Sequence, residues 1–164
     1  ITHQTGNADY ENVKKQYAVK GFSANVMSFV TDMPVRYRLA SLVICRSGAT
    51  TLAEITAAGR ASFLIPFPYA ANNHQEHNAR IIETASAGEM VLDKEISGEL
   101  IAKSIKKAMD EPENLQRMEN NSYRLGSRDA TEKVRKICLE LMGDARKVSE
   151  GNNESKEKHV LSCF

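Results

Sequence analysis

The stretch Leu42-Val-Ile-Cys-Arg-Ser-Gly-Ala-Thr-Thr-Leu-Ala-Glu54 decides the fold. It passes from a short apolar run through a turn of small residues into a helical pattern that ends before Gly59. This order is typical of a strand, a tight turn and a helix, which together form half of a parallel β-α-β unit. The first N–H groups of such a helix have no partner inside it and lie at its positive dipole end. The turn therefore has the outline of an anion site.

Similar patterns lie on both sides of this stretch. Short apolar runs alternate with helical patterns over residues 1–92, which is typical of a parallel sheet built from β-α units. The predicted strands are residues 1–4, 24–30, 42–45, 62–66 and 89–92. The predicted helices are residues 9–20, 33–39, 50–58 and 74–87, with Gly21, Gly59 and Gly88 where glycine commonly ends a helix. We therefore predict an α/β protein with a Rossmann-like parallel sheet and flanking helices.

The remainder of the chain has a helical pattern without strands. Ser97 is a suitable N-cap for a helix that ends before Pro112, and a second helix is predicted over residues 113–125. Residues 143–159 have almost no apolar content, so we predict a disordered tail over residues 143–164. A third helix is predicted before this tail, with its apolar residues on one stripe: Ala130, Val134, Ile137 and Leu141.

Composition excludes several classes of protein. With 164 residues, 41% hydrophobic and 26% charged, the chain fits one globular domain. The 22 Lys and Arg against 21 Asp and Glu give a net charge of +1, which argues against a nucleic-acid partner. Apolar runs such as residues 61–68 are far shorter than the ~20 residues that a membrane span needs. We therefore expect no nucleic-acid binding and no membrane-spanning segment.

The cysteines indicate the redox compartment of the protein, and the first residue bears on whether the sequence is part of a longer chain. Cys45, Cys138 and Cys163 lack C-x-x-C spacing, so we expect neither a disulfide framework nor a four-thiolate zinc site, and a reducing cytoplasm fits. The chain opens on Ile1 without a Met or a leader of signal-peptide type. We expect it to be a piece of a longer protein.

Two interpretations of the central turn remain open. Ser47, Gly48 and Ala49 are small enough to let a ligand approach the backbone, and Thr50 and Thr51 offer hydroxyl donors to phosphate oxygens. The alternative is an ordinary βα turn in which Thr51-Leu-Ala-Glu54 forms a capping box. Neither G-x-G-x-x-G nor G-x-x-x-x-G-K-[ST] occurs, so a standard dinucleotide or P-loop site is not predicted.

Two further loops carry polar groups after predicted strands. Residues 66–78 contain His74 and Gln75, each of which offers a donor and an acceptor suited to sugar hydroxyls. His74 and His77 have the spacing of two metal ligands, but no third ligand converges on them, and a solvated or capping role is the alternative. In residues 28–33, free backbone groups can read the edge of a planar base. The alternative there is that Phe29 and Met33 belong to the core.

Several further motifs stand in order along the chain. They are His3-Gln-Thr-Gly6, Phe29-Val-Thr-Asp-Met33, Val43-Ile-Cys-Arg-Ser-Gly-Ala49, Glu54-Ile-Thr-Ala-Ala-Gly59, Pro66-Phe-Pro68, His74-Gln75 with Asn78-Ala79, and Asp129-Ala-Thr-Glu-Lys-Val134. Together these motifs resemble one family over residues 1–142, the MurG family of bacterial lipid II synthases. The resemblance implies that residues 1–142 are the C-terminal, donor-binding half of the two-domain glycosyltransferase-B fold, which the predicted tail over residues 143–164 follows.

The resemblance implies a role for each matching residue. The backbone of Val30 would pair with the uracil edge, and Glu54 would accept hydrogen bonds from the ribose hydroxyls. Residues 48–51 would lie beside the diphosphate. His74 and Gln75 would contact the hydroxyls of N-acetylglucosamine, and some family members have Gln-Gln there. Arg46 also matches a family position, where it either touches the ligand or braces the turn.

The implied reaction is transfer of N-acetylglucosamine from UDP-N-acetylglucosamine to lipid I, with inversion at the anomeric carbon, in peptidoglycan synthesis at the cytoplasmic face of the membrane. No cofactor is expected, and the absence of a DxD-like acidic pair in a plausible site agrees with a metal-independent reaction. No catalytic residue is expected in this chain. The family's acceptor domain would supply the general base, the lipid I site and the membrane contact. The glycine-rich loop of the family's donor domain would precede residue 1.

Two other functions remain open. The chain can be the donor-binding subunit or domain of another UDP-sugar glycosyltransferase, or a non-catalytic α/β interaction module that uses its helical C-terminal surface. If the chain is such an interaction module, it should bind no nucleotide.

Overall fold

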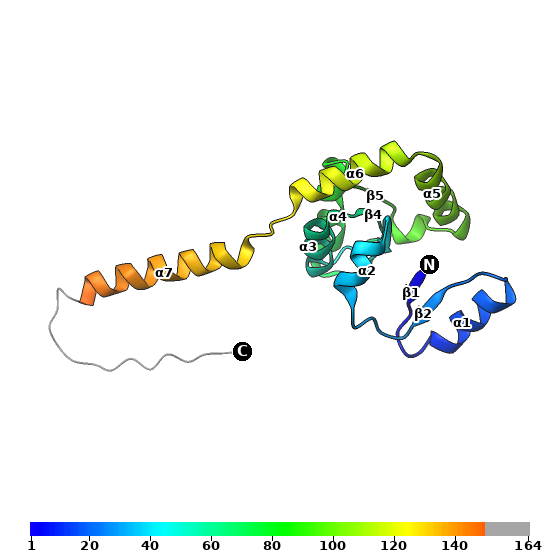
Figure 1. The fold of residues 1–164 in the computed structure, drawn as a ribbon, viewed down its shortest axis with the longest axis horizontal. Helices are drawn as coiled ribbons and strands as arrows, with labels where there is room; N and C mark the ends of the chain where they lie inside the picture. Colours follow the sequence, from blue (N-terminus) through cyan, green and yellow to red (C-terminus); the bar gives the residue numbers. More distant parts are fainter. Residues whose placement is uncertain (150–164) are drawn as a thin grey trace. The chain divides into compact units, whose positions relative to one another are not determined.

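The computed structural model describes the backbone of residues 1–149 and the side chains of residues 1–142. The chain divides into two units, Ile1–Gly126 and a second that begins at Ser127. The elements follow one another in this order (Figure 1): β1 (Thr2–Gln4), α1 (Tyr10–Val19), β2 (Asn25–Met27), α2 (Met33–Leu39), β3 (Leu42–Cys45), α3 (Ala49–Ala58), β4 (Ala61–Leu64), η1 (Ala71–Asn73), α4 (His74–Thr84), β5 (Gly88–Met90), η2 (Asp93–Glu95), α5 (Gly98–Asp110), α6 (Pro112–Leu125) and α7 (Ala130–Ser149).

All strand pairs in the described part of the chain are parallel, as the alternation of strands and helices predicted. They form two separate ladders, β1-β2 and β3-β4-β5. In the larger sheet Cys45 pairs with Leu64, and Leu64 pairs with Met90. The carboxyl ends of β3, β4 and β5 therefore lie side by side, and the segments that follow them meet at one edge of the sheet.

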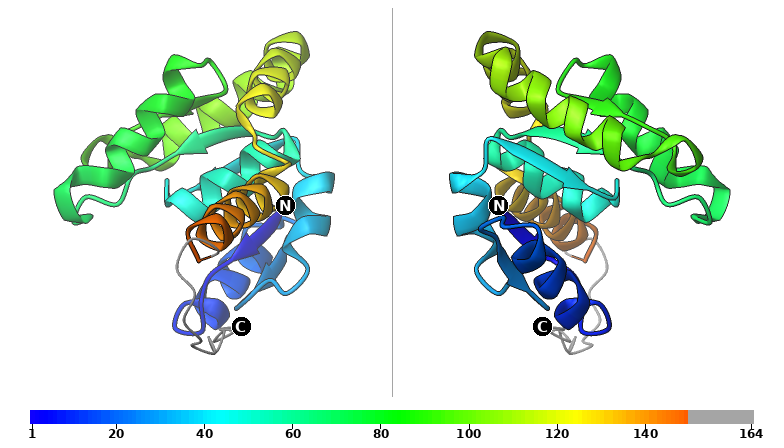
Figure 2. Two further views of the ribbon diagram at one scale, coloured as in Figure 1. Left: turned by 90° about the vertical axis from the view of Figure 1, so that its left-hand side faces the viewer. Right: turned by 90° about the vertical axis from the view of Figure 1, so that its right-hand side faces the viewer.

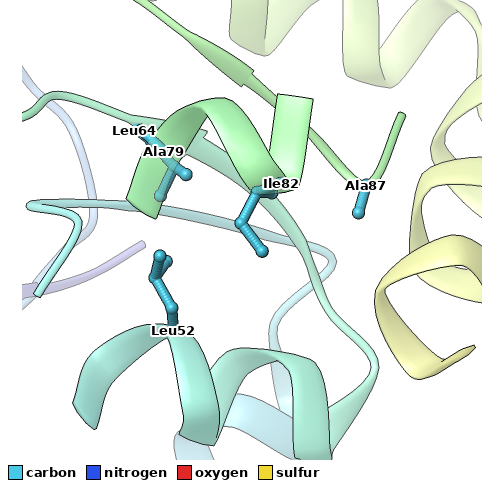
Figure 3. Close-up of a cluster of buried hydrophobic side chains, with 5 residues drawn as sticks. All are labelled: Leu52, Leu64, Ala79, Ile82 and Ala87. Carbon is cyan, nitrogen blue, oxygen red and sulfur yellow. The ribbon is translucent and has the colours of Figure 1, made fainter. Parts of the chain in front are cut away.

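The core lies around β4, whose four residues are all buried. Such a strand has helices on both faces, which explains why Ser62 is buried together with its three apolar neighbours. On one face Leu64 packs with Leu52 of α3 and with Ala79 and Ile82 of α4 (Figure 3). On the other face Phe63 lines a small cavity with residues of α5 and α6. The sheet is therefore the middle layer of an α/β/α arrangement, with helices on either side (Figure 2).

Three local predictions were tested by the geometry of helix ends. Gly21 and Gly59 end α1 and α3 with φ of 70° and 63°, as predicted. Gly88 does not end α4: this helix ends at Thr84, and Ser86 takes the left-handed conformation with φ of 52°. Gly88 instead opens β5, where an added Cβ would lie 2.5 Å from Ser62 Oγ. It is glycine because neighbouring strand atoms fill the space.

The helical C-terminal part forms largely as predicted. The hydroxyl of Ser97 caps α5 by accepting a hydrogen bond from the N–H of Leu100 at 3.1 Å. In the second unit α7 continues to Ser149, beyond the predicted start of the tail at residue 143. Residues 150–164 of that predicted tail lie outside the described residues. Over the described part of the chain, no helix combines the length and apolar content of a membrane span.

Candidate functional site

The candidate site lies at the carboxyl edge of the β3-β4-β5 sheet. The turn after β3 enters α3, and the loop after β4 enters α4. Because Cys45 and Leu64 are partners in register, the turn and the loop start next to each other. Ligands of open parallel α/β sheets bind at this edge.

The N-terminus of α3 is open to a ligand. Gly48 is the N-cap, with φ of −64° and ψ of 144°, and the first helical bond runs from the N–H of Leu52 to its carbonyl at 3.0 Å. The N–H groups of residues 49–51 therefore have no intrahelical partner. A Cβ added to Gly48 would meet only Thr51 Oγ1, at 3.8 Å. This free space above positively polarised N–H groups is suited to a phosphate.

The capping-box interpretation of the same turn is wrong. The N-cap of α3 is Gly48, which has no side chain to form the box, and no side-chain cap is made there. Glu54 lies further along α3, and its carboxylate accepts a hydrogen bond from Tyr37 instead. The backbone N–H groups in the first turn of α3 therefore have no side-chain cap.

Ser47 supports the turn from behind. Its side chain is fully buried, and its hydroxyl donates to the carbonyl oxygen of Gln75 at 2.7 Å. The carbonyl of Ser47 accepts from Nδ2 of Asn78 at 3.1 Å. These two bonds join the turn to the first turns of α4. Ser47 was predicted as a binding residue; in the structure its side chain has no exposed surface and holds the turn against α4.

Arg46 braces the same edge of the sheet. Its Nη1 donates to the carbonyl oxygens of Ile65 at 3.2 Å and Pro66 at 3.1 Å, and pairs with Asp93 at 2.5 Å. The guanidinium also lies over the ring of Phe67, with Cζ 5.7 Å from the ring centroid. Arg46 thus connects the segments after β3, β4 and β5, and these contacts support bracing over ligand contact.

His74 and Gln75 lie together at the start of α4, next to the turn. His74 is exposed, and its Nδ1 is 2.8 Å from the carbonyl oxygen of Ala71. Because a carbonyl only accepts, Nδ1 carries the proton and Nε2 of the neutral ring is left as an acceptor. The Gln75 side-chain oxygen accepts from the N–H of Phe67 at 3.0 Å, which leaves its amide nitrogen as a donor. The pair thus offers one acceptor and one donor to sugar hydroxyls.

Val30 occupies the loop after β2. Its side chain is buried, and its N–H donates to Gln4 Oε1 at 2.9 Å. In this structure the amide oxygen of Gln4 accepts from the Val30 N–H, which is the donor predicted to meet a base edge. Sequence analysis quoted Gln4 within the motif His3-Gln-Thr-Gly6 but gave it no role, because its contact with Val30 spans 26 residues. The alternative of Phe29 as a core residue is wrong, since its side chain is 68% exposed.

Glu54 lies on the exposed face of α3, and its Oε2 accepts a hydrogen bond from the Tyr37 hydroxyl at 3.1 Å. Tyr37 belongs to α2 and is buried. Burial, and then the negative charge of Glu54, raise the pKa of the Tyr37 hydroxyl far above its ordinary value. Sequence analysis missed Tyr37, because its contact with Glu54 spans 17 residues. Close by, burial raises the pKa of the Cys45 thiol to about 12.

His74 and His77 are not joined by a third metal-ligating side chain in the described part of the chain. Over the described residues, no group of three or more His, Cys, Asp and Glu side chains is arranged to hold a metal ion. His74 has its Nδ1 occupied by Ala71, as the alternative of a solvated or capping role predicted.

A Rossmann-like sheet with an open helix N-terminus at its carboxyl edge is the architecture of a nucleotide-binding half-domain. The chain belongs to the glycosyltransferase family 28 C-terminal domain family, whose profile matches residues 1–136. The resemblance to MurG is therefore confirmed.

Relatives and a solved structure carry the same likeness. The chain is 48% identical over 142 residues to the "UDP-N-acetylglucosamine--N-acetylmuramyl-(pentapeptide) pyrophosphoryl-undecaprenol N-acetylglucosamine transferase" of Thermodesulfovibrio yellowstonii, covering 87% of this chain and 39% of the relative. It is 44% identical to the Anaeromyxobacter sp. strain K transferase of the same name, covering 87% and 37%. The crystal structure of Acinetobacter baumannii MurG matches with a TM-score of 0.77 and 27% identity, covering 85% of this chain and 41% of that one.

These likenesses confirm the predicted fold, the C-terminal half of a glycosyltransferase-B enzyme. The chain spans less than half the length of the relatives that it matches.

Proposed function

We propose that this chain is the UDP-N-acetylglucosamine-binding part of an inverting glycosyltransferase that transfers N-acetylglucosamine to lipid I in peptidoglycan synthesis. The observation that carries the proposal is the open N-terminus of α3, where Gly48 leaves room above unpartnered N–H groups. The names of relatives at 44–48% identity state this donor sugar and this acceptor. The whole protein would thus be a hexosyltransferase, and this chain would supply its donor site.

The diphosphate fits the first turn of α3. As the bond between the sugar and UDP breaks, negative charge grows on the diphosphate oxygens. Fixed N–H donors and the helix dipole stabilise that charge without reorganising, and the hydroxyls of Thr50 and Thr51 add donors in the same turn. The chain's own contribution to rate is therefore to make UDP a better leaving group.

The other groups of the donor fall on the neighbouring loops. The Glu54 carboxylate would accept hydrogen bonds from the ribose hydroxyls, and the Val30 backbone would meet the uracil edge once Gln4 gives up its hydrogen bond. His74 and Gln75 would contact the N-acetylglucosamine hydroxyls with one acceptor and one donor. No residue of this chain acts as the general base in the proposal.

The acceptor side belongs to the rest of the protein in this proposal. A second domain would bind lipid I, supply the base for its hydroxyl and touch the membrane, with the whole protein peripheral at the cytoplasmic face. Residues 1–142 would form the donor-binding domain, which includes the first part of α7.

The direct test is an NMR titration of this chain with UDP-N-acetylglucosamine and UDP-N-acetylgalactosamine. We expect amide shifts at Val30, over residues 48–54 and at His74 and Gln75, with tighter binding of the gluco sugar. Thr50→Ala, in the first turn of α3, should weaken the binding of both ligands. Thr84→Ala, at the C-terminal end of α4 and away from His74 and Gln75, should weaken the binding of neither. Absence of shifts with both ligands would contradict the proposal and favour a non-catalytic interaction module. Equal or tighter binding of the galacto sugar would favour another UDP-sugar transferase.

A further inference from the structure

Tyr37 is a buried polar side chain that contacts the candidate site from behind. It lies on α2, a short helix between the β2 loop and β3, and α2 packs against α3. Its side chain is 8% exposed, and its hydroxyl is 3.1 Å from Glu54 Oε2. A phenylalanine would fill the same volume, so the hydroxyl adds one specific feature, a donor aimed at this carboxylate.

The environment of Glu54 gives that donor its importance. Glu54 is exposed and forms no ion pair with any cation in the described part of the chain. A free glutamate side chain samples many rotamers, and a ligand must select one of them at an entropic cost. The bond from Tyr37 removes part of that freedom before a ligand arrives.

The donor also persists over the working pH range. Burial and the neighbouring negative charge keep the Tyr37 hydroxyl protonated, because both raise its pKa. A protonated phenol can donate to Glu54 while leaving the second carboxylate oxygen for another donor. The Glu54 carboxylate is therefore held by one oxygen and open at the other.

We propose that Tyr37 is a positioning residue for nucleoside recognition: it holds one oxygen of Glu54 so that the carboxylate is preset for the two ribose hydroxyls of the donor nucleotide. The inference rests on the proposed function and goes beyond it by assigning a role to a residue that does not touch the ligand. The α2-α3 contact then serves recognition of the sugar of the nucleoside, in addition to packing.

The test separates positioning from general structural support by using two nucleotides. Affinities of UDP and 2′,3′-dideoxyuridine diphosphate are measured by calorimetry for the unsubstituted chain and for Tyr37→Phe. We expect Tyr37→Phe to weaken UDP affinity about 5-fold and to change affinity for the dideoxy ligand less than 2-fold. The loss is smaller than the 10- to 100-fold of one hydrogen bond to a charged group, because Tyr37 does not touch the ligand and acts only by restricting Glu54. Tyr17→Phe is the matched control, because it removes a hydroxyl that bonds to His3 at 3.2 Å in another part of the fold.

Two further measurements complete the test. In the Glu54→Ala background, Tyr37→Phe should have no further effect on UDP affinity, because its partner is gone. Thermal unfolding of each variant shows whether the fold is kept. Equal weakening of both nucleotides, or no weakening of either, would overturn the positioning role while leaving the proposed function intact. Failure of the unsubstituted chain to bind UDP at all would overturn both.

Discussion

Gly48→Ala is the substitution that most directly probes the anion site. The backbone of Gly48, with φ of −64° and ψ of 144°, suits alanine, and the new methyl group would meet only Thr51 Oγ1 at 3.8 Å. Replacing glycine stabilises a protein by ~0.4–1 kcal/mol through the unfolded state, and the weaker N-cap preference of alanine offsets about that much. The free energy of unfolding should therefore change by less than ~0.5 kcal/mol.

Binding should respond very differently. A methyl group at Gly48 projects into the free space that the diphosphate needs, and it displaces the phosphate oxygens from the N–H groups of α3. Loss of one charge-assisted hydrogen bond amounts to about 1.5–3 kcal/mol, so affinity for UDP-N-acetylglucosamine should fall roughly 10- to 100-fold. Calorimetric titration at constant salt measures this loss, and thermal unfolding measures stability on the same samples.

Gly98→Ala is the matched control. Gly98 opens α5, and a Cβ there meets nothing within 4 Å. This variant should bind the donor as the unsubstituted chain does. A Gly48→Ala chain that is folded and binds within twofold of the unsubstituted chain would refute the placement of the diphosphate at α3.

Three other perturbations have expected outcomes. Glu54→Ala should weaken donor affinity by about 1–3 kcal/mol through lost ribose hydrogen bonds, and an unchanged dissociation constant in calorimetry would remove Glu54 from the site. Gly88→Ala should destabilise the chain by about 1–3 kcal/mol in denaturant unfolding, since its Cβ would lie 2.5 Å from Ser62 Oγ, and unaltered stability would contradict this packing. At pH 8 a thiol reagent should modify exposed Cys138 long before Cys45, and peptide mass spectrometry measures both rates. The reason is that burial raises the pKa of the Cys45 thiol to about 12 and leaves almost no thiolate. Comparable modification rates at the two cysteines would refute this.

The sequence was a good guide where structure is decided locally. Period and glycine placement predicted the strands and helices of the βα units, and residues 42–45 match β3 at both ends. The errors lie where long-range packing decides. Ser86, not Gly88, takes the left-handed conformation after α4, because Gly88 is needed for close approach to Ser62. Asn72 and Asn73 are also left-handed, with φ of 51° and 52°, and begin α4 through a 3-10 turn that the pattern did not predict.

The candidate site shows the same division. The turn that opens α3 could be predicted from its small residues, because helix N-termini carry their anion preference in the backbone. The bonds from Ser47 to Gln75 and from Tyr37 to Glu54 could not, since they join residues 28 and 17 positions apart. No spacing rule covers such pairs, which depend on how α2, α3 and α4 pack. The sequence thus indicated the turn that opens α3, and the fold was needed to find the hydrogen bonds that hold its neighbours in place.

The bonds of Ser47 and Asn78 have an evolutionary consequence. They join the turn after β3 to the start of α4, so His74 and Gln75 cannot shift without moving the turn. If these two residues contact the sugar as proposed, a lineage would change its sugar preference on this scaffold by exchanging side chains at positions 74 and 75. Remodelling the loop would displace the N-terminus of α3, where the diphosphate is proposed to bind.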